Sequence, residues 1–272
     1  MTESIDVTED HLKRARQLVE EAHANDGLAP VDLDLFWEQD AIAHEDPLAE
    51  DCPQVPLGIG MSKDCIGPEL DADPDWYRLV HDAEYRADWA GRYNDKAERI
   101  VGKRLLNENV PDAGPQMPNV KGIEDIFEAE NVWHAGSYWL QQSADTPSEL
   151  EALLDRVDER LENLREFILP DNWEEKKAVA LKAGRQVPRY TSQRGPVTFA
   201  ASVYGPENLI FLLVDDPELA GRFRDTILRA MLERGRILEE ESAEPESERW
   251  KGFSFADDNC ALLNPEMYEF FG

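Results

Sequence analysis

The sequence predicts an α/β protein: a (β/α)8 TIM barrel, incomplete at the C-terminus, with an N-terminal helical extension. Three short segments, residues 55–60, 189–194 and 253–256, have the length and the flanking Pro or Gly residues of strands. Helices separate them and no tight hairpin joins any two, so parallel pairing through crossovers is expected. The crossovers are long, which favours an elaborated barrel over a compact doubly wound sheet. The expected domains are residues 1–50, the extension, and 51–272, the front of the barrel.

The first half of the chain is expected to be helical around one strand. Thr8 is a suitable N-cap for an amphipathic helix over residues 8–24, and a short helix is expected near residues 33–43. Residues 55–60 form a short apolar run between prolines and glycines, which is typical of a buried strand. An aromatic-rich helix follows at 74–91, and residues 93–119 are expected to be irregular.

The second half contains clearer helix signals. Thr146, Pro147 and Glu149 predict the start of a helix that runs to about residue 167, and another spans 171–183 before Gly184. A strand ending at Arg194 precedes helices from residue 196, over 206–214 and over 216–241. Residues 253–256 then form the third strand. Residues 264–272 are typical of a helix that has only begun, so we expect the front part of a longer enzyme that is inactive by itself.

The composition excludes several classes of partner. The 58 acidic and 28 basic residues give a net charge of −30, whose field repels nucleic acid and anionic membranes. No apolar run approaches the length of a membrane span, and the acidic N-terminus lacks the features of a signal peptide. Three cysteines form no paired framework, which favours a reducing cytoplasm.

In a barrel, the residues that follow the strands share one mouth and form the active site. Asp257 and Asp258 follow the third strand and are the candidate catalytic residues, because a carboxylate near a cation can hold a proton at a useful pKa. The alternative is that one of them caps the following turn and the other faces water. The candidate substrate-binding residues are Lys63, His134, Gln193, Arg194, Gly195 and Asn259.

Two of these binding residues also have structural interpretations. Arg194 could form an ion pair, and His134, which lies among aromatic residues, fits a packing role better than a catalytic one. No metal site is predicted: Cys260 has no second Cys or His at ligand spacing. The sequence also contains no Gly-rich phosphate loop and no nucleophile elbow.

Residues 186–272 resemble the uroporphyrinogen decarboxylase superfamily. The resemblance depends on an ordered set of short motifs: Gly195-Pro196-Val197-Thr198, Gly205-Pro206-Glu207-Asn208-Leu209, Asp216-Pro217-Glu218, and Asp257 followed by Leu263-Asn264-Pro265-Glu266. It implies a (β/α)8 barrel and either corrinoid-linked or thiol-linked methyl transfer or the decarboxylation of a tetrapyrrole in porphyrin biosynthesis. Residues 90–93 echo the Arg-Gln-Ala-Gly-Arg-Tyr signature of the decarboxylases, but Asp88 and Trp89 stand in place of its Arg-Gln pair. This departure favours methyl transfer.

The resemblance also implies cofactors and partners. A methyltransferase of this superfamily uses zinc and a corrinoid partner, and its zinc ligands would lie beyond Gly272. A decarboxylase needs no cofactor and would use Arg194 for carboxylates and Asp257 or Asp258 near the pyrrole nitrogens. A small molecule, tetrapyrrole or corrinoid is the expected substrate, and a homodimer is one candidate assembly. A third alternative is a non-catalytic binding protein for an organic acid or a tetrapyrrole.

Overall fold

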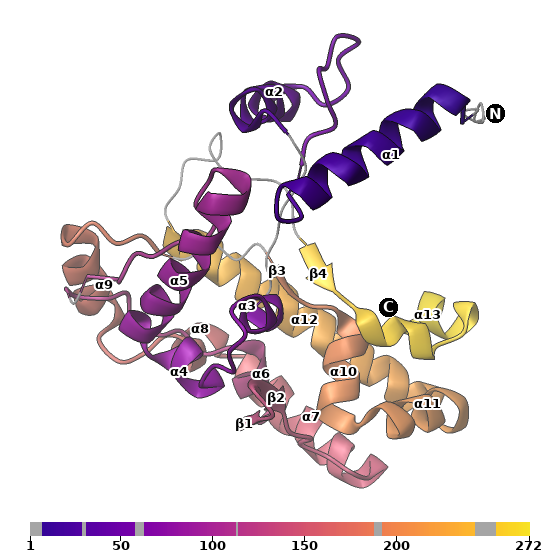
Figure 1. Cartoon of the computed structure of the whole chain (residues 1–272). Helices are drawn as coiled ribbons and strands as arrows, with labels where there is room; N and C mark the ends of the chain where they lie inside the picture. Colours follow the sequence, from indigo (N-terminus) through magenta and orange to yellow (C-terminus); the bar gives the residue numbers. More distant parts are fainter. Residues whose placement is uncertain (1–6, 29–30, 58–62, 113, 188–191, 243–253) are drawn as a thin grey trace. The chain divides into compact units, whose positions relative to one another are not determined.

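The computed structural model describes residues 7–28, 31–57, 63–112, 114–187, 192–242 and 254–272 (Figure 1). Helices account for 62% and strands for 6%, and the described strands form only two sheets of two strands each. The prediction of a barrel is therefore wrong. Contacts divide the chain into two compact units, Met1–Pro111 and Asp112–Gly272.

The regular elements among the described residues of the first unit are all helices. Its helices are α1 (Glu9–Ala24), α2 (Leu33–Glu45), α3 (Lys63–Glu69), α4 (Trp76–His81) and α5 (Ala83–Val101). Thr8 caps α1 as predicted, and the carboxylates of Asp32, Asp75 and Asp82 cap α2, α4 and α5. These caps satisfy backbone N–H groups that have no partner within their own helix.

Two expectations for the first unit are wrong. Residues 55–57 are not a strand: Val55 is 86% exposed, so the apolar run is not buried in a sheet. Residues 58–60, the rest of that predicted strand, lie outside the described residues. Helix α5 continues to Val101 through residues expected to be irregular, and Gly102 ends it in the left-handed conformation, with φ of 70°.

The described helices of the second unit are α6 (Ile123–Ile126), α7 (Pro147–Leu161), α8 (Leu164–Ile168), α9 (Trp173–Lys182), α10 (Pro196–Tyr204), α11 (Pro206–Asp215), α12 (Pro217–Ser242) and α13 (Pro265–Phe271), with a short 3-10 helix η1 (Asp258–Leu262). Of these, α7, α9, α10, α11, α12 and α13 begin close to where the sequence places them, whereas α6, the separate helix α8 and η1 were not predicted. Thr146 and Glu149 form the predicted capping box of α7.

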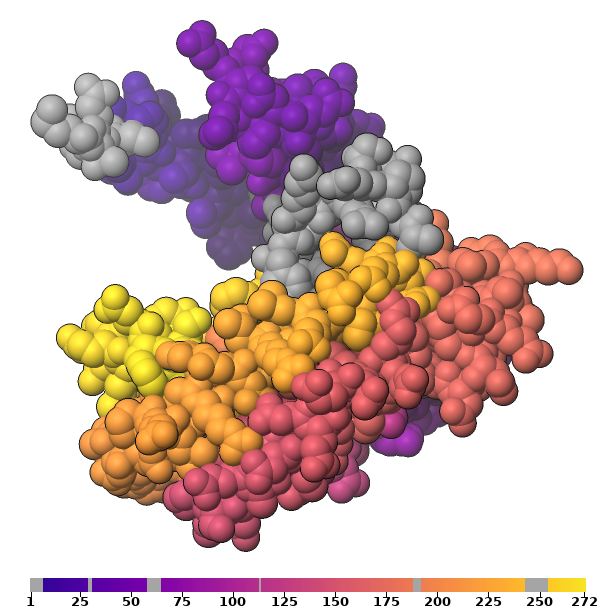
Figure 2. Space-filling view, turned by 180° about the vertical axis from the view of Figure 1, so that it is seen from behind, coloured from indigo at the N-terminus to yellow at the C-terminus, as the bar shows by residue number. Residues whose placement is uncertain are grey.

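The core of the second unit lies between α12 and the helices packed against it. Helix α12 contacts α7, α10 and α11, and Figure 2 shows it lying along the back of this unit. Phe199, Phe223 and Phe271 are fully buried, and their rings, with that of Phe127, meet edge to face or tilted. The apolar stripes predicted on α7 and α12 thus pack against each other, and helices supply the core that the barrel was expected to provide.

A β-hairpin in the second unit was not predicted. Strands β1 (Asn131–His134) and β2 (Ser137–Leu140) pair antiparallel, so the expectation that no tight hairpin joins two strands is wrong. The turn places Ala135 at φ of 49° and Gly136 at φ of 80°. Such turns usually contain Asn-Gly or Asp-Gly, because those residues tolerate positive φ, and Ala-Gly gives a much weaker signal.

The second sheet matches one prediction. Strands β3 (Ser192–Arg194) and β4 (Ser254–Ala256) pair in parallel, with Gln193 opposite Phe255. Their C-terminal ends therefore lie together, as expected for residues 189–194 and 253–256, and α10, α11 and α12 form the crossover between them. Within the described residues no further strand joins this pair.

Candidate functional site

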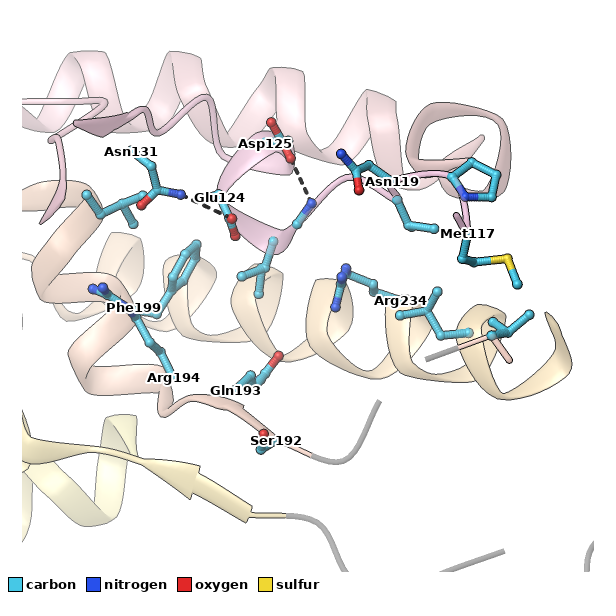
Figure 3. A pocket seen from close by; sticks show the side chains of 17 residues that line it. Met117, Asn119, Glu124, Asp125, Asn131, Ser192, Gln193, Arg194, Phe199 and Arg234 are labelled. Carbon is cyan, nitrogen blue, oxygen red and sulfur yellow. Dashed lines mark hydrogen bonds between the residues drawn. The ribbon is translucent and has the colours of Figure 1, made fainter. Parts of the chain in front are cut away.

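A cavity of about 780 Å³ opens in the second unit beside β3 (Figure 3). Its walls come from the segment leading into α6, the β1–β2 hairpin, β3, α10 and α12. Polar side chains enter from four of these elements: Glu124 of α6, Asn131 of β1, Gln193 and Arg194 of β3, and Arg234 of α12. This combination of volume and converging polar groups is typical of a small-molecule site.

Strand β3 carries the two lining residues that the sequence predicted. The amide of Gly195 donates to the carbonyl of Ala256 at 2.7 Å, which continues the pairing with β4 to the end of β3. Helix α10 begins directly afterwards, and Arg194 Nη1 donates to the hydroxyl of Ser202 on that helix at 2.9 Å. The guanidinium group is therefore oriented by a neutral partner.

Arg194 forms no ion pair with any carboxylate in the described part of the chain, so the ion-pair interpretation does not describe it. Arginine has five N–H donors, and the bond to Ser202 uses one nitrogen only. In a chain with 58 acidic residues, a cavity-lining arginine without a carboxylate partner needs an explanation. Its remaining donors can bind an anionic ligand.

Asp257 does not line the cavity. Its carboxylate accepts from the amide of Thr198 at 2.6 Å and from that of Val197 at 3.4 Å, so it caps α10 across the sheet. Gly195 has no side chain to obstruct it: a Cβ there would lie 2.3 Å from the Cβ of Asp257. This arrangement is close to the capping alternative, although the capped helix is α10 rather than the following turn.

The other predicted site residues are dispersed. Asp258 is exposed at the start of η1, and the amide of Asn259 donates to the Thr198 hydroxyl at 3.1 Å. His134 is exposed at the end of β1, where its carbonyl accepts from Trp139 Nε1. Lys63 begins α3 in the first unit. The structure thus brings Gln193 and Arg194 into the cavity and places Gly195, Asp257 and Asn259 at the start of α10.

Sequence reasoning missed Glu124, Asn131 and Arg234. Arg234 had a usable signal: it lies three residues after Met231 and four before Leu238, on the buried stripe of α12. A charge on such a stripe often has a specific partner, and Arg234 Nε donates to the carbonyl of Lys121 at 3.0 Å. Glu124 accepts from Asn131 Nδ2 at 3.2 Å. No comparable sequence pattern distinguishes Glu124 or Asn131.

The corner between α6 and β1 is fixed to α7 by an ion-pair cluster. Glu128 accepts from Arg156 at 2.7 and 2.9 Å and also from Arg160, while Arg160 donates to the carbonyl of Ile126 at 2.8 Å. The hydrogen bonds from Arg156 are the main cause that lowers the pKa of Glu128 to about 2; burial opposes the shift and Arg160 adds to it. The cluster fixes the wall that presents Glu124 and Asn131.

The described residues contain no group of three or more His, Cys, Asp or Glu that could hold a metal ion. No single described helix is long and apolar enough to cross a membrane; α10 and α11 reach that length and composition only as a pair, bent by 103°. No protein-family model, curated protein or solved structure matches the chain. The resemblance to the decarboxylase superfamily therefore depends on the sequence motifs alone.

Proposed function

We propose that the second unit binds a small organic acid in the cavity beside β3. The observation that carries this proposal is Arg194, which lines the cavity, is oriented by Ser202 and has no carboxylate partner among the described residues. A guanidinium group can bind a carboxylate through two parallel hydrogen bonds. Arg234 adds a second guanidinium to the same cavity from α12. This is the binding function that the sequence offered as its third alternative.

The charge of the whole chain opposes such a ligand at long range. A net charge of −30 repels an anion until it reaches the arginines, and dissolved salt screens that repulsion over roughly 8 Å at physiological ionic strength. Arg194 is exposed, but a contact at hydrogen-bond distance is screened less than this long-range repulsion. We therefore expect a dicarboxylate to bind more tightly as the salt concentration rises, which is opposite to the usual behaviour of an anion site on a basic protein.

Turnover of the bound acid, by methyl transfer or by decarboxylation, is a second proposal that comes from the sequence resemblance. The observation in its favour is that Arg194, the residue assigned to carboxylates, lines the cavity. The positions of the two aspartates give it less support, because the carboxylate of Asp257 caps α10 and Asp258 is exposed. Binding without turnover is therefore the function that the geometry supports best.

Isothermal titration calorimetry with succinate, using the whole chain, tests the binding proposal. Arg194→Gln removes the charge and should weaken binding at least about tenfold. Arg236→Gln is the matched control, because Arg236 is 64% exposed on α12 and pairs with Glu240; its affinity should equal that of the wild type. Failure of the wild-type protein to bind succinate at about 1 M KCl, or equal weakening by both substitutions, would contradict the proposal.

A further inference from the structure

We propose that the acid bound in this cavity also carries a hydrogen-bond donor, either a hydroxyl or an ammonium group, and that Gln193 recognises it. The inference rests on the proposed function and specifies its ligand class: a hydroxy acid or an amino acid rather than an unsubstituted dicarboxylic acid. Its basis is the side-chain oxygen of Gln193, which is buried and has no hydrogen-bond partner among the described residues.

The position of Gln193 makes this oxygen a recognition group. Backbone pairing with Phe255 of β4 fixes the residue in the sheet, and its side chain lines the cavity (Figure 3). Figure 3 shows the oxygen turned towards the space between Arg194 and Arg234. A ligand donor that reaches it would replace a hydrogen bond lost on burial, and we expect this to raise affinity roughly tenfold.

The other polar groups of the cavity fit a ligand that has both a carboxylate and a hydrogen-bond donor. Arg194 offers donors, which suit a carboxylate, and Arg234 lines another wall of the cavity. Glu124 offers an acceptor: one of its oxygens accepts from Asn131 at 3.2 Å, and a carboxylate has about four acceptor positions. A ligand with a carboxylate at one end and a hydroxyl or ammonium group nearby would satisfy both sets. An unsubstituted dicarboxylate would leave the Gln193 oxygen without a donor.

Three acids with the same four-carbon skeleton test the inference by calorimetry at high salt. Succinate has no donor beside its carboxylates, malate adds a hydroxyl and aspartate adds an ammonium group. We expect malate, aspartate or both to bind about tenfold more tightly than succinate. In Gln193→Met, which keeps the length of the side chain but lacks the oxygen, the preference over succinate should fall about tenfold while succinate affinity is unchanged.

The outcomes separate this inference from the proposed function. Equal wild-type affinity for the three acids, or a preference of unchanged size in Gln193→Met, overturns the role of Gln193 but leaves organic-acid binding in place. Absence of binding for all three overturns both. A second measurement does not depend on the variant folding: the side-chain amide NMR signals of wild-type Gln193 should shift with malate or aspartate more than with succinate. Equal shifts for the three acids would count against the inference.

Discussion

Neutralising Glu128 should destabilise the second unit, and the size of the effect should depend on pH in a defined direction. Glu128 has a pKa lowered from 4.5 to about 2, chiefly by Arg156. The two values differ by about 2.5, which at about 1.4 kcal/mol per pKa unit sets an upper limit near 3.5 kcal/mol. The side chain is 33% exposed, so solvent screening reduces the expected contribution to about 1–2 kcal/mol.

The sign follows from the lowered pKa of the folded state. Protonation of Glu128 costs the folded protein more than the unfolded one, so the stabilisation is complete above about pH 4.5 and is lost as the pH falls towards 2. Glu128→Gln cannot titrate. The difference in the free energy of unfolding between wild type and variant should therefore be about 1–2 kcal/mol at pH 7 and decrease steadily below about pH 4.5.

Urea denaturation followed by far-UV circular dichroism at several pH values between about 3 and 7 measures this difference. Glu151→Gln, an exposed substitution on α7, the helix that carries Arg156, controls for the general loss of a negative charge. A Glu128→Gln protein as stable as the control at pH 7 would refute the reasoning. A difference that stays constant as the pH falls would also refute it, because the cluster would then act through packing rather than charge.

Two further substitutions test the framework of the second unit. Gly195→Ala places a Cβ 2.3 Å from that of Asp257, so it should lower the free energy of unfolding by about 2–4 kcal/mol. Asp257→Gly removes the opposing Cβ, so in a double-mutant cycle the two losses should be less than additive, and full additivity in urea unfolding would argue against the contact. Burial raises the pKa of Glu241, but hydrogen bonds from Lys177 and Trp173 outweigh burial, so the pKa is lowered. The charged carboxylate therefore stabilises the folded protein above about pH 4.5, and this stabilisation weakens as the pH falls below that value. Glu241→Gln leaves Lys177 without its charged partner, so the free energy of unfolding should fall by about 3 kcal/mol. Unfolding followed by tryptophan fluorescence, to which Trp173 contributes, measures this change, and an unchanged free energy of unfolding would count against the ion pair.

Local signals predicted the helices well because the groups that define a helix end are close in sequence. Thr8 and Thr146 each accept from an amide three residues later, which is the contact that their sequence patterns predict. The hairpin was missed because its turn uses Ala135 where Asn or Asp is usual. The barrel prediction failed for a different reason. A strand can be identified locally, but the number of its neighbours in a sheet depends on residues far away in the sequence.

The candidate site shows the same limit. Gln193 and Arg194 could be predicted because they end a strand, and such ends often carry functional side chains. Glu124 and Arg234 are more than a hundred residues apart in the sequence, and they line the same cavity only because α6 and α12 pack together. Nothing local to Glu124 distinguishes it from the other acidic residues of this chain. Arg234 could have been recognised from its place on the apolar stripe of α12.

The position of Asp257 decides how the start of α10 should be interpreted. The carboxylate of Asp257 already accepts hydrogen bonds from two amides at the N-terminus of α10, those of Val197 and Thr198. To reach a ligand in the cavity it would have to release the amide of Thr198. The same carboxylate, kept in place, joins β4 to α10 and so fixes the turn that follows Arg194. Its contribution to the cavity is therefore indirect: Asp257 positions the strand end at which Arg194 lies.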